Sequence, residues 1–286
     1  MHKSLVWRAL ALAVSTVMCA MSAGAIGNVT AGDVTFGYTN DFSTSPSNTV
    51  DVQLTGASPS DMAFESWWFY RVSGGSFESP FANPDIELYG LNGGSVGALG
   101  WNDPTGAGLF SAALSFEVFD SGTGGNLFQN MRITNTSGAS LSIDVFHYSD
   151  LDLAGTSGGD RARLGSNPGG IQIDQSEGTQ TAPIVGYGAN GYRVSPYSQL
   201  LADLTDGGVD NLANTGLPLN NRDVTVGFQW TITIAAGGYF DFMTQFGSNA
   251  PLLDPSVTVI PEPGTALLLA LGLIGLAFPV RRTEIA

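Results

Sequence analysis

Short runs of β-branched and aromatic residues recur along the chain, separated by clusters of Gly, Ser, Asn and Asp that are typical of turns. In residues 141–145 and 229–234 apolar and polar positions alternate, which is the period of a strand with one buried face. The pattern predicts strands over residues 34–38, 49–54, 67–72, 109–119, 127–134, 141–148, 171–174, 224–234 and 239–246.

One segment has the pattern of a helix. An apolar stripe is formed by Leu200, Leu201 and Leu204. Ser195 and Pro196 supply an N-cap and a first-turn proline before the stripe, and Gly207 is a stop signal after it. Because alternating strand and helix units are absent, the pattern predicts an all-β fold, an antiparallel two-sheet β-sandwich with one short helix.

Two segments predict how strands pack. Residues 67–70 send aromatic side chains to both faces of a strand, so we expect this strand to lie between two layers, with Arg71 paired at its end. Residues 131–133 and 141–143 are expected to form a β-hairpin across residues 135–140.

Residues 1–25 have the parts of a secretory signal peptide. Lys3 and Arg8 form a short positive region, and an apolar stretch follows that is too short for a comfortable membrane span. Ala23 and Ala25 then provide the small residues of a cleavage site, and we expect cleavage after Ala25. The apolar stretch is expected to be a signal helix.

The other end of the chain carries a proline motif before a second apolar stretch. Pro261-Glu262-Pro263 leads into residues 264–280, which are uncharged and predict a transmembrane helix of roughly 25 Å. Arg281-Arg282 follows and is expected to stay on the cytoplasmic side. The two prolines give this helix a sharp start with an extended, accessible strip before it.

This order of parts resembles the PEP-CTERM sorting signal, over residues 259–282. The resemblance implies an exported protein that uses the Sec machinery and is processed by exosortase, a membrane-embedded transpeptidase of exopolysaccharide-making Gram-negative bacteria. It also implies transient anchoring in the inner membrane and then a place at the cell surface or in the extracellular matrix. The expected organisation is a signal peptide (1–25), an extracellular domain (26–250), a Pro-containing linker (251–260) and the sorting signal (261–286).

Charge and cysteine content narrow the function of the extracellular part. Residues 26–260 contain 23 acids against six arginines and no lysine, a formal charge of −17. Such a surface repels nucleic acid, so no nucleic-acid partner is expected. The single cysteine, Cys19, lies in the signal peptide, which excludes disulfides and zinc–thiolate sites from the mature chain.

One loop has the composition of a weak Ca²⁺ site. Asp150 and Asp152 place carboxylates two residues apart, and Asp160 follows a few residues later. An EF-hand loop is excluded, because Ala154 and Arg161 occupy positions that need oxygen ligands. In the alternative, the aspartates cap turns or pair with neighbouring arginines. We therefore assign no cofactor at this point and keep Ca²⁺ as a candidate. A second acidic loop contains Asp203, Asp206 and Asp210.

Patterns for catalysis are weak. Ser95 and Ser157 both lie in G-x-S-x-G sequences, which a chain rich in Gly and Ser produces by chance, and no helix pattern follows Ser95. His147 is the one histidine of the mature chain, and strand alternation predicts that it is buried near a strand end. No catalytic residue is assigned.

Two hypotheses for function follow. In the first, the chain is a non-catalytic surface or matrix protein associated with exopolysaccharide or biofilm. In the second, it is an extracellular carbohydrate-binding or carbohydrate-active β-sandwich protein, with or without Ca²⁺. Trp101, in a loop rich in Gly, Asn, Asp and Pro, is the candidate exposed ring for glycan contact. A carbohydrate-active enzyme would need paired carboxylates drawn from Glu65, Glu117 or Asp150.

Overall fold

The computed structural model describes residues 27–38, 50–54, 62–63, 65–122, 124–153 and 155–254. The predicted signal peptide with its cleavage site, most of the predicted linker, and the sorting signal lie outside these residues. In the part of the chain that the structure describes, the one α-helix is much too short to cross a bilayer, and no candidate membrane span is found there.

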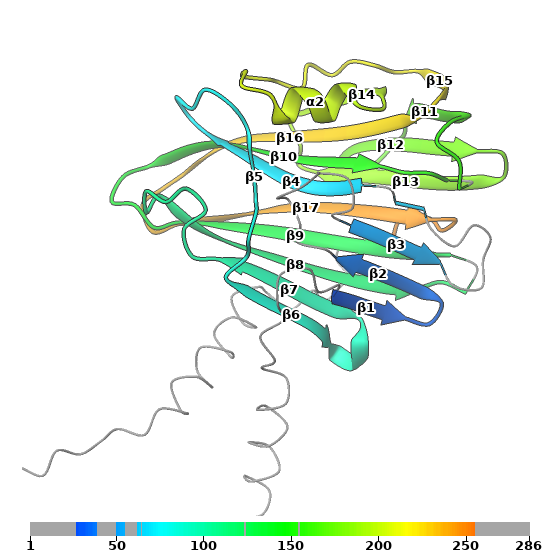
Figure 1. Cartoon of the computed structure of the whole chain (residues 1–286), viewed down its shortest axis with the longest axis horizontal. Helices are drawn as coiled ribbons and strands as arrows, with labels where there is room; N and C mark the ends of the chain where they lie inside the picture. Colours follow the sequence, from blue (N-terminus) through cyan, green and yellow to red (C-terminus); the bar gives the residue numbers. More distant parts are fainter. Residues whose placement is uncertain are drawn as a thin grey trace, which may run out of the picture.

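Strands dominate the described residues and form three antiparallel sheets (Figure 1). The largest has nine strands in the order β15 (Leu219–Arg222), β11 (Asp160–Leu164), β12 (Gly170–Glu177), β13 (Gln180–Tyr187), β17 (Tyr239–Ser248), β9 (Gly125–Asn135), β8 (Phe110–Asp120), β7 (Val96–Trp101) and β6 (Ile86–Leu91). The second has five, in the order β14 (Gly191–Pro196), β16 (Val224–Ile234), β10 (Leu141–Asp150), β4 (Glu65–Val72) and β5 (Ser79–Pro80). A third, smaller sheet contains β1 (Gly27–Ala31), β2 (Val34–Tyr38) and β3 (Val50–Leu54).

The predicted all-β sandwich with one short helix is therefore confirmed for the described residues, and every predicted strand overlaps an observed one. The helix α2 spans Gln199–Thr205 and buries the three predicted leucines. Its start differs from the prediction, because Ser195 and Pro196 are the last residues of β14. A 3-10 turn, η1 (Asn92–Gly94), joins β6 to β7.

The predicted hairpin between residues 131–133 and 141–143 is wrong. β9 pairs with β8 and β17 in the nine-stranded sheet, whereas β10 pairs with β4 and β16 in the five-stranded sheet. The intervening residues carry the chain from one sheet to the other. Met131 and Ile143 both face the core, but from opposite sides of it. A shared apolar pattern thus does not distinguish two strands of one sheet from two facing strands.

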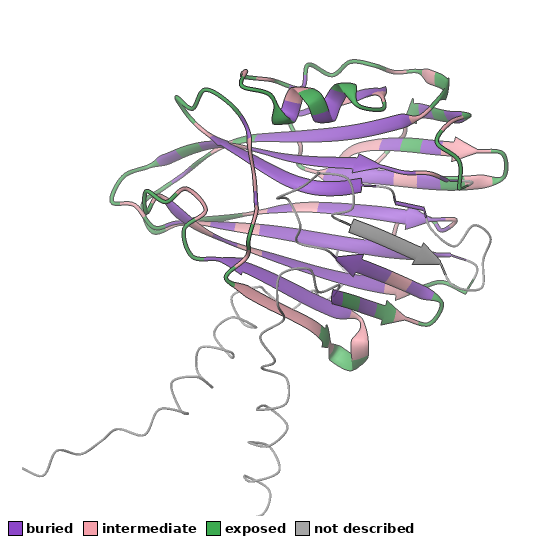
Figure 2. Cartoon of the chain, in the orientation of Figure 1, coloured by how far each residue is buried: buried purple, intermediate pink, exposed green. Residues whose placement is uncertain are grey.

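Aromatic side chains fill the layer between the sheets, where burial is highest (Figure 2). Trp68 on β4 stacks on Trp230 at 5.7 Å, and its indole N–H donates across the sandwich to Oε1 of Gln129 on β9 at 3.0 Å. Phe36 of the three-stranded sheet packs edge-on against Phe116 of β8 at 5.1 Å. The smaller sheet therefore shares this core.

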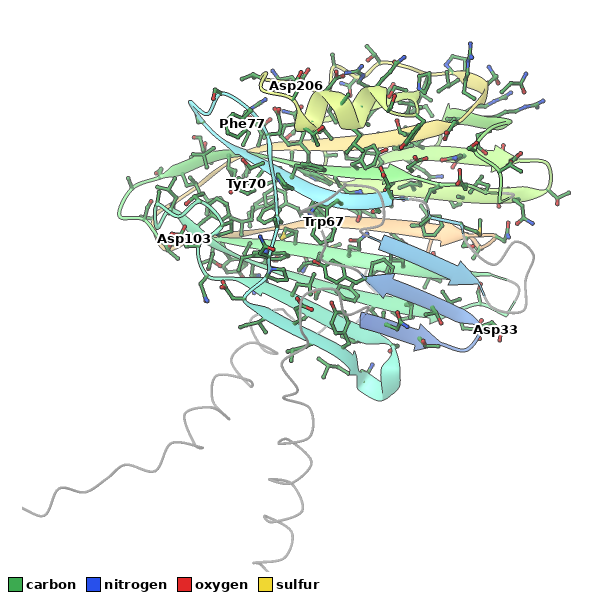
Figure 3. The ribbon with its side chains drawn as sticks, viewed as in Figure 1. Asp33, Trp67, Tyr70, Phe77, Asp103 and Asp206 are labelled. Atoms are coloured by element: carbon green, nitrogen blue, oxygen red, sulfur yellow. The ribbon has the colours of Figure 1, made fainter. Side chains whose placement is uncertain are left out.

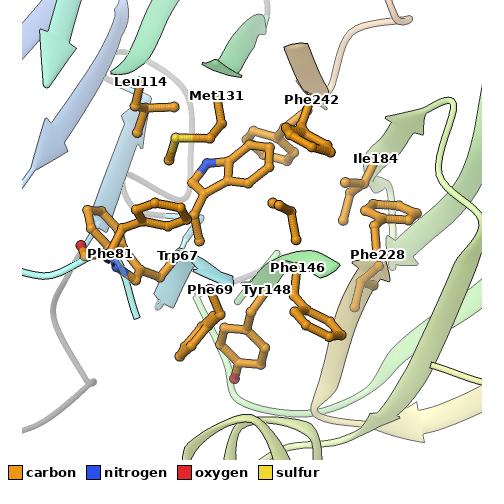
Figure 4. Close-up of a cluster of buried hydrophobic side chains, with 14 of the residues drawn as sticks. Trp67, Phe69, Phe81, Leu114, Met131, Phe146, Tyr148, Ile184, Phe228 and Phe242 are labelled. Atoms are coloured by element: carbon orange, nitrogen blue, oxygen red, sulfur yellow. Dashed lines mark hydrogen bonds between the residues drawn. The ribbon is translucent and has the colours of Figure 1, made fainter. Parts of the chain in front are cut away.

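The five-stranded sheet is buried on its other face as well, because α2 covers it (Figure 1). Phe69, Phe146 and Tyr148 lie on this outer face, opposite the side of Met131 and Phe242 (Figure 4). The helix packs closely over Gly227, because a Cβ at this position would lie only 2.8 Å from Cδ2 of Leu200. The expectation that residues 67–70 lie between two layers is thus confirmed.

Arg71 is paired at the end of β4, as predicted. Its guanidinium forms ion pairs with Glu78 and, at 2.6 Å, with Asp144. It also donates to the carbonyl oxygen of Asp210 at 2.7 Å and to Oδ1 of Asn211 at 2.6 Å. This network joins β4, β10 and the loop after α2 at one end of the outer face.

Candidate metal centre

Carboxylates gather at the opposite end of this outer face. Glu65 is the first residue of β4 and lies directly opposite Asp150, the last residue of β10, which lies in turn opposite Thr225 of β16. Asp223 immediately precedes β16, and Asp152 follows β10 by two residues. We call Glu65, Asp150, Asp152 and Asp223 the acidic centre.

Three members of the acidic centre are arranged to share one ligand. Asp150, Asp152 and Asp223 each offer a carboxylate oxygen, and these atoms lie within 4.8 Å of one another. Ca²⁺ binds oxygen at 2.3–2.6 Å, so two of its ligand atoms lie at most about 5 Å apart. Asp152 and Asp223 are half-buried, which leaves the centre accessible from the surface.

The two innermost carboxylates have no compensating partner among the described residues. Glu65 and Asp150 are each 1% exposed, and both oxygens of Glu65 and Oδ1 of Asp150 make no hydrogen bond. Oδ1 of Asp223 and the Tyr148 hydroxyl are also buried without a hydrogen-bond partner. Buried ionised groups normally pair with an opposite charge or bind a metal, because desolvation is costly.

The electrostatics of the acidic centre reflect this lack of positive charge. Burial, with added repulsion from the carboxylates of Asp223 and Asp152, raises the pKa of Asp150 to about 9. Burial also raises the pKa of Glu65 to about 7, and the nearby Tyr148 hydroxyl offsets part of that rise without reaching hydrogen-bond geometry. The pKa of Asp223 rises to about 6 by burial and repulsion from Asp152.

Asp160, the third predicted aspartate, lies beside the acidic centre but is held differently. It is fully buried at the start of β11, and Nε2 of Gln175 donates to its Oδ2 at 2.9 Å. Burial raises its pKa to about 7, and repulsion from Glu177 and Asp152 contributes. Its Oδ1 has no partner among the described residues. Asp160 is thus near enough for its charge to interact with Asp152, but one of its oxygens already accepts a hydrogen bond from Gln175.

The alternative in which neighbouring arginines neutralise these aspartates is not what the described residues show. The arginines in ion pairs are Arg71, Arg132 and Arg193, which pair with carboxylates outside the acidic centre. The second acidic loop is compensated in this way, because Asp203 pairs with Arg193. Oδ1 of Asp206 accepts from the backbone N–H of Gly208, which is a turn contact.

The sequence singles out Asp150 and Asp152 as neighbours, and the structure also places Asp223 with them. The one sequence signal for Asp223 is its position directly before a β-rich run. Glu65 appears in the sequence as one of several scattered acids. The register of β4 against β10 brings it to Asp150. Glu117 lies elsewhere, opposite Val96 of β7, where it accepts from Nδ2 of Asn92 at 3.5 Å.

The expectation that Trp101 offers an exposed ring is wrong. It is the last residue of β7, it is 4% exposed, and its indole N–H donates to the carbonyl oxygen of Ala82 at 2.9 Å. Its ring packs against Phe81 at 5.4 Å. The polar residues that follow it form the loop, while the tryptophan itself closes one end of the core.

His147 is buried, as the strand pattern predicts, and faces the other layer. It lies between the sheets, where its Nε2 is 3.2 Å from both Oγ of Ser66 and Nε2 of Gln129. Burial lowers its pKa to about 3. A cavity of about 10 Å³, room for about one water molecule, adjoins it. Because His147 and Asp150 point to opposite faces of β10, the imidazole does not serve the acidic centre.

No protein-family profile matches the chain, and no curated protein matches it by sequence. Solved structures do match its fold. A galactose mutarotase related enzyme from Lactobacillus acidophilus aligns with 79% of this chain and 98% of its own, with a TM-score of 0.51 and 6% identity. A galactose mutarotase-like protein from Lactobacillus casei aligns with 78% of this chain and 100% of its own, with a TM-score of 0.51 and 8% identity.

A bacterial glucoamylase complexed with acarbose also aligns, with a TM-score of 0.52 and 13% identity over 88% of this chain. The present chain spans about a third of that enzyme, 34% of its length. At such identities the likeness concerns the fold alone. The described part of the chain is therefore a β-sandwich of the galactose mutarotase-like kind.

Proposed function

We propose that the protein is an exported, non-catalytic surface protein that binds Ca²⁺ at the acidic centre and associates with extracellular polysaccharide. The observation that carries the proposal is the pair of buried carboxylates, Glu65 and Asp150: both oxygens of Glu65 and Oδ1 of Asp150 lack a hydrogen-bond partner, and neither group has an opposite charge beside it among the described residues. A bound divalent cation would coordinate these oxygens and supply the opposite charge. The non-catalytic part of the proposal comes from the sequence, where no catalytic pattern has the partners it needs.

The donor chemistry fits Ca²⁺ better than a transition metal. All the donors of the acidic centre are carboxylate oxygens, and Ca²⁺ takes six to eight oxygen ligands in flexible geometry. Zinc sites are built from imidazole and thiolate, but His147 faces the other side of β10 and Cys19 belongs to the predicted signal peptide. Asp150, Asp152 and Asp223 would hold the ion. Glu65, which lies opposite Asp150, would add a negative charge beside it.

A cation bound at this site would cross-link distant segments of the sandwich. The acidic centre joins β4, β10, the loop after β10 and the start of β16, which are segments far apart in the chain. In the absence of disulfides, cross-linking by a cation is a means of stabilising an extracellular domain. When Ca²⁺ is present at 100 times its dissociation constant, the added stability is about 2.7 kcal/mol.

The polysaccharide part of the proposal rests on two independent supports. The fold neighbours include proteins whose names refer to galactose and to a glucoamylase bound to acarbose. The ends of the chain resemble the export and sorting signals of PEP-CTERM proteins, whose hosts make exopolysaccharide. Export through Sec, processing by exosortase at Pro261-Glu262-Pro263, and release to the surface or matrix are part of the same proposal.

Calorimetric titration of the exported full chain with CaCl₂ tests the cation site. We expect saturable binding of one Ca²⁺ and a higher melting temperature in Ca²⁺ than in EDTA, with a smaller effect of Mg²⁺. The matched variants are Asp150→Asn, which removes a ligand, and Asp206→Asn, which removes the same charge from an exposed turn. If no binding heat is observed and the melting temperatures in Ca²⁺ and EDTA are equal, the proposed cation site is wrong.

A further inference from the structure

The basic residues of this acidic protein are divided into two groups. Arg71, Arg132 and Arg193 form ion pairs with carboxylates. The remaining arginines of the extracellular part are all exposed and form no ion pair among the described residues; they are Arg161, Arg163 and Arg222. We call these three the arginine strip.

Two neighbouring strands, β11 and β15, carry the arginine strip. Arg161 and Arg163 alternate with buried Ala162 on β11, so both point to the same side of the sheet. β15, the edge strand of the nine-stranded sheet, pairs with β11, and Arg222 at its end lies opposite Asp160, the residue before Arg161, at a shift in the register. Side chains with nitrogen tips gather beside β15 and β11 (Figure 3). On the other neighbouring strand, β12, Asp174 lies opposite Arg163 and on the same face of the sheet, and its Oδ1 accepts from Nε2 of Gln172 at 2.6 Å.

A groove of about 590 Å³ adjoins the arginine strip. Its lining combines a guanidinium, an amide, a phenol ring and apolar side chains, from Arg163, Leu164, Tyr192, Leu217, Pro218 and Asn220. Leu164 is 59% exposed, which is unusual for a leucine at the end of a strand and leaves its apolar surface free for a ligand.

We propose that the arginine strip and this groove bind an acidic polysaccharide, one that carries uronate carboxylates. Guanidinium groups bind carboxylates in a bidentate manner, which gives geometric selectivity as well as charge attraction. The Tyr192 ring and Leu164 offer apolar surface to the face of a sugar ring, while Asn220 offers hydrogen bonds to hydroxyl groups. The strongly acidic remainder of the surface confines a polyanion to this one strip.

This inference rests on the proposed function and names its polysaccharide class, but it does not require the cation site. Binding is tested with the exported full chain by native electrophoresis in gels that contain hyaluronan, in which a uronate alternates with a neutral sugar, or dextran, which is uncharged. We expect retardation by hyaluronan and none by dextran, and we expect added salt to weaken it.

The decisive variant replaces all three arginines of the strip by glutamine. We expect hyaluronan affinity to fall about tenfold or more, because each lost guanidinium removes charge-assisted hydrogen bonds. The triple Arg→Lys variant should keep part of the affinity. A control with the same change in net charge, Ser76→Glu, Ser140→Glu and Ala236→Glu, alters exposed turn positions outside the strip and should bind like the wild type. Melting temperatures of all variants verify folding.

Several results would overturn the inference. These are the absence of wild-type retardation by hyaluronan, equal retardation by dextran, or a glutamine variant that binds as well as the wild type. Equal binding of single-stranded DNA would show that the strip recognises polyanions in general. Calcium titration of the same samples separates the two proposals, because loss of Ca²⁺ binding alone would contradict only the proposed cation site.

Discussion

Glu65 and Asp150 lie directly opposite each other at the ends of β4 and β10, both almost fully buried and with oxygens that lack hydrogen-bond partners. Like charges in direct opposition on neighbouring strands destabilise a sheet. The pair is thus a local conflict, in contrast to the buried charges of Arg71 and Glu78, which form an ion pair. Local conflicts of this kind concentrate at functional sites.

Replacing Asp150 by Asn should have opposite effects in two buffers. In EDTA at pH 8 the variant should be more stable than the wild type, because Asp150, whose pKa is raised to about 9, must take up a proton on folding at this pH, whereas Asn is uncharged in both states. In saturating Ca²⁺ it should be less stable, because the ion stabilises the wild type by roughly 5–10 °C and the variant by little. Thermal unfolding measures both. Asp206→Asn, on an exposed turn, should leave the melting temperature unchanged in both buffers. If Asp150→Asn is more stable than the wild type in both buffers, the cation site is contradicted.

The stability of the metal-free protein should fall as pH rises. Burial and mutual repulsion raise the pKa to about 9 for Asp150, about 7 for Glu65 and about 6 for Asp223. An acid with a higher pKa in the folded state binds more protons when folded, so protonation favours folding. This contribution is fully present below the unfolded pKa, near 4, and is lost as pH rises through about 6 to 9.

Melting temperatures in EDTA at pH 5, 7 and 9 measure this loss. Excess Ca²⁺ should weaken or reverse the trend, since the cation binds the deprotonated carboxylates and competes with protons. Asp150→Asn should flatten the curve in EDTA, because it removes the group with the largest shift. A metal-free protein that gains stability between pH 5 and pH 9 would be inconsistent with the acidic centre as described.

The buried ion pairs of Arg71 make a separate prediction about stability. Arg71→Met should lower the free energy of unfolding by about 3–5 kcal/mol, because it leaves Glu78 and Asp144 charged, largely buried and unpaired. Urea unfolding measures the change. Arg161→Met, at an exposed position without an ion pair, should stay within about 0.5 kcal/mol of the wild type. Adding Glu78→Gln to Arg71→Met should recover part of the loss, and failure to do so would argue against a paired-charge origin.

Most of the sandwich follows from local sequence pattern, because strands such as β8, β10 and β16 have long β-branched and aromatic runs. Among the strands that the pattern misses are β15, the edge strand of the nine-stranded sheet, and its neighbour β11, whose sequences LNNR and DRARL are polar and mostly exposed. Nor does alternation say which sheet a strand joins, which is why β9 and β10 are expected as a hairpin but lie in different sheets.

The candidate site is less accessible to prediction than the fold. Asp150 and Asp152 are neighbours in sequence, and their spacing is a visible signal. Glu65 and Asp223 reach them through the register of β4, β10 and β16, which depends on contacts between distant segments. Trp101 is a different kind of failure. The Gly, Asn, Asp and Pro residues around it predict an exposed loop, but Trp101 itself is the last residue of strand β7.

The acidic centre and the arginine strip are joined by the same two segments, so Ca²⁺ should strengthen polysaccharide binding. Arg222 at the end of β15 is followed directly by Asp223, and Asp160, beside the centre, opens β11 and is followed by Arg161. A cation that fixes these segments reduces the ordering cost of binding at the strip. We expect hyaluronan affinity to be a few-fold higher in Ca²⁺ than in EDTA, and Ca²⁺ affinity to rise by the same factor with hyaluronan, as linkage requires.

Asp150→Asn should lose this difference between the two buffers while keeping its hyaluronan affinity in EDTA, and Asp206→Asn should retain the difference. If Asp150→Asn still binds more tightly in Ca²⁺, the ion bridges protein and polysaccharide directly, and coupling through the acidic centre is wrong.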